Sequence, residues 1–355
     1  MRVGVCEKRT SMRRCCAPLC YNLSKNKNQN EPVAFSTHMV LEMETPKRMQ
    51  QESLANEFQG YRPLLFSIAY RMLGSASEAE DMLQECYLRS VQASSQEIRS
   101  LKSYLTTILT RLCLDYLKSA RVQREEYIGP WLPEPVLTVN PEELALQTLE
   151  QRESLSTAFL LLAERLTPNE RAVFLLHEAF AYRYEEIAEI IGKSPVNCRQ
   201  LFHQAKEHLT KNRTRFSPSQ EALQRLMEQF LSASQQGDMQ ALVGVLAQDM
   251  TWWPDGGGKV HAAPYALPGR EQVLRVWKGL LRQAAASYPN VHLALAPVNG
   301  SIGLLVWSEK TLLSVFTCEI TEGQISALYA VVNPDKLVYI QKQVQSHDSF
   351  SDAAS

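Results

Sequence analysis

Apolar residues recur every three or four positions over residues 54–125, which is the period of an α-helix with one buried face. The pair Gly74-Ser75 interrupts this period and predicts the end of a helix. Ser77, with Glu80 three residues later, has the pattern of a capping box that begins the next helix. The pattern therefore predicts a domain made of helices.

Prolines and a glycine break the helical period over residues 126–141, which predicts a stiff, extended linker. Helical spacing returns over residues 142–215. Within it, Thr167 precedes Pro168, and Glu170 completes the pattern of a capped helix start. A second helical domain is therefore expected after the linker.

The residues 219–340 show a different pattern. Helical stretches come first, and short runs of alternating apolar and polar residues follow from about residue 291. Asn299-Gly300 and Glu322-Gly323 lie between these runs and are typical of hairpin turns. The pattern predicts a small α+β domain with an antiparallel sheet.

The length of 355 residues agrees with several domains, because one compact core rarely exceeds a few hundred residues. The net charge of −1 argues against a uniformly basic protein, although local basic surfaces remain possible. No uninterrupted apolar stretch predicts a membrane span, and the first residues lack the apolar run of a secretory signal. A cytoplasmic protein is expected.

The cysteines are unevenly distributed along the chain. Cys6, Cys15, Cys16 and Cys20 crowd the first twenty residues without the paired spacing of zinc sites, so no metal is predicted. The other cysteines lie on apolar patterns and are interpreted as reduced core residues. We expect residues 1–50 to be a disordered leader and residues 341–355 a disordered tail. No cofactor is predicted.

Two short helices joined by the turn Gly192-Lys193 form the sharpest local pattern. Across residues 193–215 six basic residues stand against one acid, which suits a phosphate backbone. A DNA-reading helix-turn-helix fits this pattern, and so does a helical pair with a solvated basic face. The candidate DNA-contacting residues are Ser194, Asn197, Arg199, Gln200, His203 and Lys206.

A second basic cluster lies in the first helical domain and includes tyrosines. Such a mixture suits single-stranded DNA, because rings stack on bases while cations follow the backbone, although charge runs are more often solvated faces. By contrast, residues 78–85 carry four acids and no base, which suits a basic protein surface. The candidates for single-stranded DNA are Arg99, Lys102, Tyr104, Arg111, Lys118 and Arg121.

In this order the motifs resemble bacterial RNA polymerase sigma factors of the extracytoplasmic-function group. Asp81-Met82-Leu83-Gln84-Glu85 resembles the region 2 helix that docks on the polymerase, and Leu112-Cys113-Leu114-Asp115 the part that melts the −10 element. Leu166–Arg171 and Tyr184–Ala188 resemble region 4, which reads the −35 element. The resemblance implies polymerase contacts by Glu80, Asp81, Gln84 and Glu85.

The resemblance extends to one subgroup with a fused SnoaL-like domain. Tyr127–Pro135 is similar to its linker, and Asp255–Lys259 and Asn333–Leu337 match two of its motifs. It implies a multidomain protein: two all-α sigma domains (a region 2 helical bundle and a region 4 helix-turn-helix), then an α+β SnoaL/NTF2-like domain with a curved antiparallel sheet. That domain is expected to regulate the sigma domains through intramolecular contacts made by Trp131, Asp255, Gly256, Gly257, Gly258, Lys259, Asn333, Pro334, Asp335 and Lys336.

Other readings remain open at this point. The glycines can simply form a hairpin turn. The C-terminal domain can be an enzyme or a ligand sensor, with Asp255, His261 and His292 as candidates for acid–base chemistry. The whole chain can be a helix-turn-helix regulator that senses a small ligand. We expect a non-catalytic initiation factor whose partners are RNA polymerase core enzyme and promoter DNA, with no membrane contact.

Overall fold

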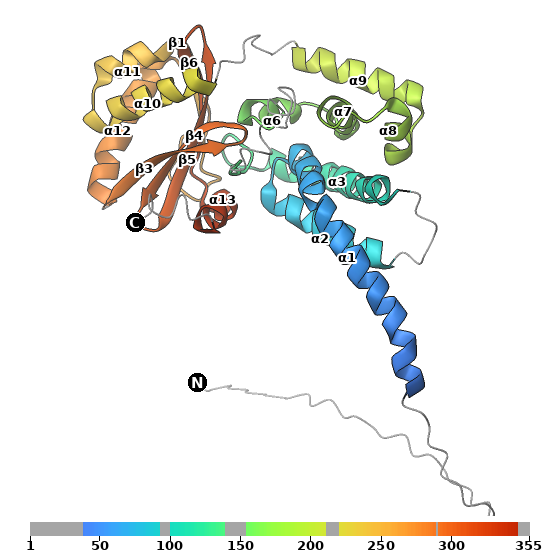
Figure 1. The fold of residues 1–355 in the computed structure, drawn as a ribbon. Coiled ribbons are helices and arrows are strands. Elements are labelled where there is room, and N and C mark those ends of the chain that lie inside the picture. The colour runs from blue at the N-terminus through green and yellow to red at the C-terminus, as the bar shows by residue number, and fades with distance from the viewer. Residues whose placement is uncertain (1–37, 93–99, 139–153, 211–219, 289, 347–355) are drawn as a thin grey trace, which may run out of the picture. The chain divides into compact units, whose positions relative to one another are not determined.

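A computed structural model describes residues 38–92, 100–138, 154–210, 220–288 and 290–346, without the side chains of 38–52, 120–125, 210, 220 and 285 (Figure 1). The chain divides into two compact units, Met1–Gln50 and Gln51–Ser355. The contacts described below belong to the second unit.

The first helical domain consists of α1 (His38–Leu73), α2 (Ala76–Gln92) and α3 (Leu101–Glu125). Apolar side chains at the predicted spacing, among them Leu65 and Leu105, are buried in its core. The start of α1 at His38 differs from the expected disordered leader, because residues 38–50 are helical.

The start of α2 differs from the predicted capping box of Ser77 and Glu80. The backbone N–H groups of Ala76 and Ser77 donate instead to Glu134 Oε2, at 2.9 and 3.0 Å. A carboxylate at this position satisfies otherwise unpaired N–H groups and complements the positive end of the helix dipole. Ser75 adds a local cap, because its Oγ accepts the Glu78 N–H at 3.1 Å, and it donates in turn to Glu134 Oε1 at 2.8 Å. The start of α2 is therefore capped jointly by Ser75 and by Glu134 of the linker, far away in the sequence.

The second helical domain contains the predicted helix-turn-helix. Thr167 and Glu170 form the predicted capping box, with bonds of 2.8 and 3.3 Å. Gly192 has a φ of +68°, a left-handed conformation that glycine adopts without steric cost, and it ends the first helix of the pair. The elements are α6 (Thr157–Ala163), α7 (Pro168–Phe174), the π-helix η1 (Leu175–Ala179), α8 (Tyr184–Ile191) and α9 (Pro195–Thr210).

The two helical domains share one hydrophobic core. Arg171 of α7, only 3% exposed, donates to the carbonyl of Met72 at 2.7 Å and pairs with Glu164 at 2.6 Å. Arg71 of α1 in turn donates to Ser154 Oγ at 2.9 Å. These buried polar contacts fix the second helical domain against the end of α1.

The C-terminal domain contains a six-stranded sheet in the order β2-β1-β6-β5-β4-β3. The predicted antiparallel pairing holds for four of the five neighbouring strand pairs, and the sheet is mixed because β1 pairs with β6 in parallel. The pattern also did not identify β1 and β2 as strands. The strands are β1 (Leu246–Asp255), β2 (Leu267–Pro268), β3 (Val291–Val298), β4 (Ser301–Ser308), β5 (Thr311–Thr321) and β6 (Gln324–Val331).

Helices cover both faces of this sheet (Figure 1). One face packs on α10 (Gln220–Gln236), α11 (Met239–Val245) and α12 (Arg270–Ser287). The other face packs on α13 (Pro334–Ser346) and on linker residues. Because α13 continues to Ser346, residues 341–346 are helical and do not belong to the predicted disordered tail.

The linker is extended, as predicted, and much of it is buried. Residues 132–137 are all buried, and Leu137 forms an isolated antiparallel bridge with Val298 of β3. The linker therefore lies between the first helical domain, through Glu134, and the C-terminal sheet.

Candidate functional site

The outward side of α9 carries five of the six predicted duplex-contacting residues, and the sixth, Ser194, directly precedes the helix; each of the six is exposed. Ser194 caps the helix, because its Oγ accepts the Asn197 N–H at 3.2 Å. Cys198 and Phe202, on the opposite side, are buried in the shared core. We call the exposed set of Ser194, Asn197, Arg199, Gln200, His203 and Lys206 the recognition surface.

Two cations at the flank of the recognition surface pair with acids on neighbouring elements. Arg199 contacts Glu185 of α8 at 3.1 Å, and Lys206 contacts Glu178 of η1 at 3.5 Å. Their side chains are about half exposed, at 54% and 51%. Such pairs contribute little stability in water, so phosphate groups can replace the acids at small cost.

The basic surface of α3 is in a different environment. Arg111 donates to the backbone carbonyls of Ile190 at 2.9 Å and Glu189 at 3.1 Å, at the carboxyl end of α8. A cation is favoured there by the negative end of the helix dipole. Lys102 lies 5.6 Å from the centre of the Tyr182 ring. The second helical domain therefore contacts part of the predicted single-strand surface.

The other residues of this surface are placed unevenly. Tyr104 is half-buried and packs against the shared core, whereas Lys118 is exposed and pairs with Asp115 at 2.8 Å. Arg99 lies outside the described residues, as does the side chain of Arg121. We call Lys102, Tyr104, Arg111 and Lys118 the α3 surface.

The acidic helix α2 exposes two of the four residues implied in polymerase contact, and the other two are partly buried. Asp81 and Gln84 are exposed, and Glu85 pairs with Arg89 one turn away at 2.7 Å. Glu80, however, is partly covered: it pairs with Arg62 and accepts a hydrogen bond from Tyr339 Oη at 3.2 Å.

Helix α13 of the C-terminal domain therefore touches the predicted polymerase-binding helix. The Tyr339 ring also stacks on Phe66 of α1, with 5.8 Å between the ring centres. Burial, followed by the neighbouring Glu80 carboxylate, raises the pKa of the Tyr339 hydroxyl, so it stays a donor. Tyr339 could not be identified from the sequence, because its only signal was a tyrosine on a helix pattern.

The two predicted regulatory motifs meet at one edge of the sheet. β1 and β6 run in parallel, with Asp255 opposite Val331, so the segments that follow them emerge side by side. The Asp255 backbone carbonyl accepts the N–H groups of Val332 and Asn333, both at 2.9 Å. This pairing explains why residues far apart in sequence form one cluster.

The Asp255 carboxylate is fully buried and joins both motifs to the linker. It accepts hydrogen bonds from the Tyr127 hydroxyl, from the Leu132 N–H at 2.8 Å and from Lys336 Nζ at 2.7 Å. Asn333 Nδ2 also donates to Tyr127 Oη at 3.0 Å. We call Tyr127, Trp131, Asp255, Asn333 and Lys336 the linker latch.

The ammonium group of Lys336 is held by charge and by aromatic rings. It lies 4.7 Å from the centre of the Tyr127 ring and 4.4 Å from that of Trp131, and it also donates to the Leu132 carbonyl. Burial, followed by the bond to Asp255, raises the pKa of Tyr127, which keeps its hydroxyl protonated as a donor. A buried ion pair with its hydrogen bonds satisfied is costly to break from one side.

The glycines of the first motif permit close packing against the linker. A Cβ atom on Gly257 would lie 2.8 Å from Tyr127 Oη, and one on Gly258 would lie 2.9 Å from the Ile128 side chain. Gly257 has a φ of +56°, so any other residue would also be strained. The glycines therefore do more than form a hairpin turn.

The remaining motif residues lie at the rim of the latch. Lys259 and Asp335 form an exposed pair at 3.3 Å, and Pro334 is exposed at the start of α13. Gly256 is buried, with the Ala262 side chain 2.7 Å from the position of an added Cβ. These residues frame the buried charges and leave the central role to Asp255 and Lys336.

A second junction was not identified from the sequence. Asn299, 1% exposed, accepts the Val136 N–H at 2.9 Å through its side chain and donates to Tyr70 Oη at 2.9 Å. Tyr70 of α1 donates in turn to the Glu134 carbonyl at 2.6 Å. The only sequence signal was Asn299-Gly300, which correctly predicted the β3–β4 hairpin but not its contact.

The interior of the C-terminal domain is filled by aromatic rings. Trp277 lies 5.0 Å from Phe230, 5.6 Å from Trp252 and 5.5 Å from Phe316, measured between ring centres. Trp252 therefore fills a local core of the C-terminal domain. Such a plugged interior favours regulation by contact over binding of a ligand inside the sheet.

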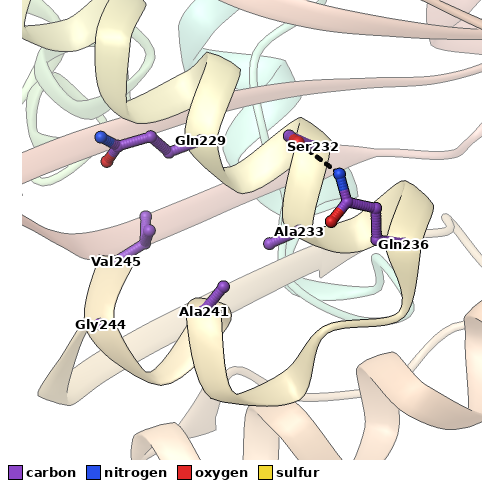
Figure 2. Close-up of a pocket in the computed structure, with 7 residues that line it drawn as sticks. All are labelled: Gln229, Ser232, Ala233, Gln236, Ala241, Gly244 and Val245. Atoms are coloured by element: carbon purple, nitrogen blue, oxygen red, sulfur yellow. Dashed lines mark hydrogen bonds between the residues drawn. The ribbon is translucent and has the colours of Figure 1, made fainter.

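A groove of about 400 Å³ lies between α10 and α11 (Figure 2). Its lining includes exposed Gln229 and Gln236, and Gln236 donates to Ser232 Oγ at 3.1 Å. No charged side chain lines it. The acid–base candidates lie elsewhere: Asp255 belongs to the linker latch, and His261 and His292 are exposed.

Within the described residues, no group of histidine, cysteine and acidic side chains is arranged to hold a metal ion. No helix among these residues is both long and apolar enough to cross a bilayer. The four cysteines near the N-terminus lie outside the described residues.

Known proteins share these sequence and structural features. Sigma-70 region 2 matches residues 58–122, and Sigma-70 region 4 matches residues 156–209. The ECF RNA polymerase sigma factor SigJ of Mycobacterium tuberculosis is 33% identical over 79% of this chain and 92% of SigJ. The probable ECF RNA polymerase sigma factor SigI of the same species is 32% identical over 81% of this chain and 96% of SigI.

The crystal structure of the M. tuberculosis extracytoplasmic function sigma factor SigJ is similar with a TM-score of 0.63. That match has 30% identity and covers 80% of this chain and 98% of the solved chain. The likeness includes more of the chain than the two helical domains, and it confirms the family predicted from the motifs. The chain belongs to the extracytoplasmic-function (ECF) family of RNA polymerase sigma factors.

Proposed function

We propose that this protein binds RNA polymerase core enzyme in the cytoplasm and directs it to promoters by contacts with the −10 and −35 elements, without catalysing a reaction itself. The observation that carries this proposal is the recognition surface, where six predicted DNA-contacting residues lie exposed on, or directly before, the second helix of a helix-turn-helix. Family membership adds the polymerase as the partner.

The work is divided among three surfaces. The exposed acids of α2 bind the polymerase, the α3 surface stabilises the opened strand, and the recognition surface enters the major groove. Flipping a base costs a few kcal/mol and stacking returns about 1–3 kcal/mol per base, so opening is close to balance. A modest bias on the sigma factor is therefore enough to regulate initiation.

The arrangement of the helical domains supports a resting form. Elements centred near −10 and −35 are about 25 base pairs apart, or roughly 85 Å at ~3.4 Å per base pair. Here the two helical domains share a core, and Arg111 is bonded to α8. The domains must therefore separate before both DNA surfaces can act on one promoter.

We further propose that the C-terminal domain controls this separation. The linker latch holds the linker at the edge of the sheet, and Glu134 connects the linker to the start of α2. Tyr339 meanwhile donates a hydrogen bond to Glu80, which the polymerase would otherwise contact. Release of α13 would free both the linker and the acidic helix.

Reconstituted transcription tests the first proposal. Core polymerase with this chain should initiate specifically from a promoter selected from a randomised library, and Arg199→Ala should reduce that initiation. Arg282→Ala, an exposed arginine on α12, serves as the control. Specific binding to duplex DNA without polymerase, combined with no initiation, would favour the ligand-sensing regulator instead.

A glycine substitution tests the proposed control by the C-terminal domain. Gly257→Ala adds a methyl group against Tyr127 at a positive φ and should loosen the latch and change promoter output. Gly237→Ala is a matched control, because Gly237 has a φ of +65° with nothing within 4 Å of the added carbon. Equal output from both variants would contradict regulation through the latch.

A further inference from the structure

The first turn of the recognition helix exposes an apolar side chain among polar neighbours. Val196 is 70% exposed, and among the described residues of α9 it is the large apolar side chain with such exposure. Gln200 and His203 follow at four and seven residues, so the three form one outward row. The buried Cys198 and Phe202 lie on the other side.

The exposed residues of α9 differ in how far they lie from the centre of its outward face. Arg199 and Lys206 lie at the flank, where they pair with Glu185 of α8 and Glu178 of η1. Val196 lies on the central row and one turn before Gln200. In helix-turn-helix proteins the N-terminal residues of the second helix reach the base edges. Val196 is therefore placed where a base, and not a phosphate, is the nearest partner.

The chemistry of the major groove leaves one chemical group of the bases that suits contact with a valine side chain. Base edges in the major groove present hydrogen-bond donors and acceptors, and the apolar group among them is the C5-methyl of thymine. A valine facing a donor or acceptor would leave that polar group without water or a partner, which costs free energy.

We propose that Val196 is a specificity-determining residue that packs on the methyl group of one thymine in the −35 element. This inference rests on the proposed function, because it requires the recognition surface to enter the major groove. It goes beyond that function by naming one residue and the base group that it contacts, in an apolar contact that hydrogen bonding does not supply. Burial of one methyl group corresponds to a factor of about four in binding.

Deoxyuridine substitution tests the contact directly, because it removes the thymine methyl and leaves base pairing intact. A −35 sequence is selected from a randomised library with the holoenzyme, and each thymine is then replaced in turn. Wild-type holoenzyme should lose about fourfold in promoter binding at one position. Val196→Ala should weaken binding to the unmodified promoter and be insensitive to deoxyuridine at that position.

Controls separate this inference from the proposed function. Val291→Ala, at an exposed valine of β3, should keep the wild-type sensitivity. If no thymine in the selected element responds, or if Val196→Ala responds as the wild type does, the inference is overturned while promoter recognition stands. If Val196→Ala weakens all sequences equally, the valine packs on the backbone and the inference is also overturned. Failure of the holoenzyme to select any sequence would contradict the proposed function itself.

Discussion

The two cationic surfaces predicted from the sequence differ in how the folded chain presents them. The recognition surface points outward, and its ion pairs are exposed. The α3 surface meets the second helical domain, with Arg111 bonded to the end of α8 and Lys102 beside Tyr182. Similar charge patterns in sequence therefore have different accessibility in the fold.

This difference implies that regulation can act on the α3 surface without changing the recognition surface. If the helical domains separate, the α3 surface changes its surroundings, whereas the recognition surface keeps its own. Regulation should therefore depend most on the contacts that hold the domains and the linker together. Substitutions at these contacts are expected to have the largest effects.

The largest effect is expected at the linker latch. Lys336→Met would leave the fully buried Asp255 carboxylate without its cation, and breaking such a pair from one side costs about 3–5 kcal/mol. Chemical denaturation should show this loss in the free energy of unfolding. Lys259→Met removes a lysine from an exposed pair and should cost less than ~1 kcal/mol. Equal losses would show that Lys336 is not a buried structural charge.

A smaller effect is expected at the interface that covers the α3 surface. The hydroxyls of Thr106 and Tyr182 are 3.1 Å apart, and both residues are buried. Tyr182→Phe removes one net hydrogen bond of about 1 kcal/mol, which corresponds to roughly a fivefold shift toward separated domains. Affinity for a single-stranded −10 oligonucleotide should rise by up to that factor, while duplex −35 binding stays constant.

The comparison fails if both oligonucleotides respond equally to Tyr182→Phe, since the recognition surface would then also be controlled by this interface. Tyr265→Phe provides the matched control. Tyr265 is 60% exposed in the C-terminal domain, so loss of its hydroxyl should change neither affinity.

The smallest effect concerns the thiols on the buried sides of the two helices. Burial raises the pKa of Cys113 in α3 and of Cys198 in α9, whereas an unfolded thiol has a pKa of about 8.5. Above that pH an unfolded thiol loses its proton more readily than the same thiol in the folded chain. Each thiol therefore contributes stability that is fully present below about pH 8.5 and is lost as the pH rises.

We expect the free energy of unfolding to fall by about 0.7 kcal/mol between pH 8 and pH 9 through Cys113, whose thiol stays protonated in the folded state, and by less through Cys198. Denaturation at both pH values, with Cys113→Ala and Cys198→Ala, measures the separate slopes. An unchanged slope in either variant would mean that the thiol ionises equally in both states.

Local features were predictable from the sequence. The helix-turn-helix depends on Ser194, Gly192 and a buried row spaced by three and four, all within one short segment. The capping box of Thr167 and Glu170 is local for the same reason. Asp255 and Lys336 were also predicted, because both lie in motifs that resemble those of a sigma-factor subgroup.

Contacts between distant segments were not predictable. Ser75 caps α2 two residues before the predicted Ser77, and Glu134 of the linker binds the N–H groups of Ala76 and Ser77 because its carboxylate reaches both at once. The contact of Tyr339 with Glu80 and that of Asn299 with Tyr70 depend on how the domains pack. The parallel pairing of β1 with β6 likewise follows from the tertiary fold and leaves no periodic signal.

The central claim is that the two helical domains must separate when the protein acts with polymerase. Labels at Glu57 and Gln204, introduced as unnatural amino acids so that the eight native cysteines do not interfere, allow the distance between α1 and α9 to be measured. The free protein should give a short distance, and the promoter complex with core polymerase a distance longer by tens of ångströms, given the roughly 85 Å between the DNA elements. An unchanged short distance in an actively transcribing complex would contradict the account.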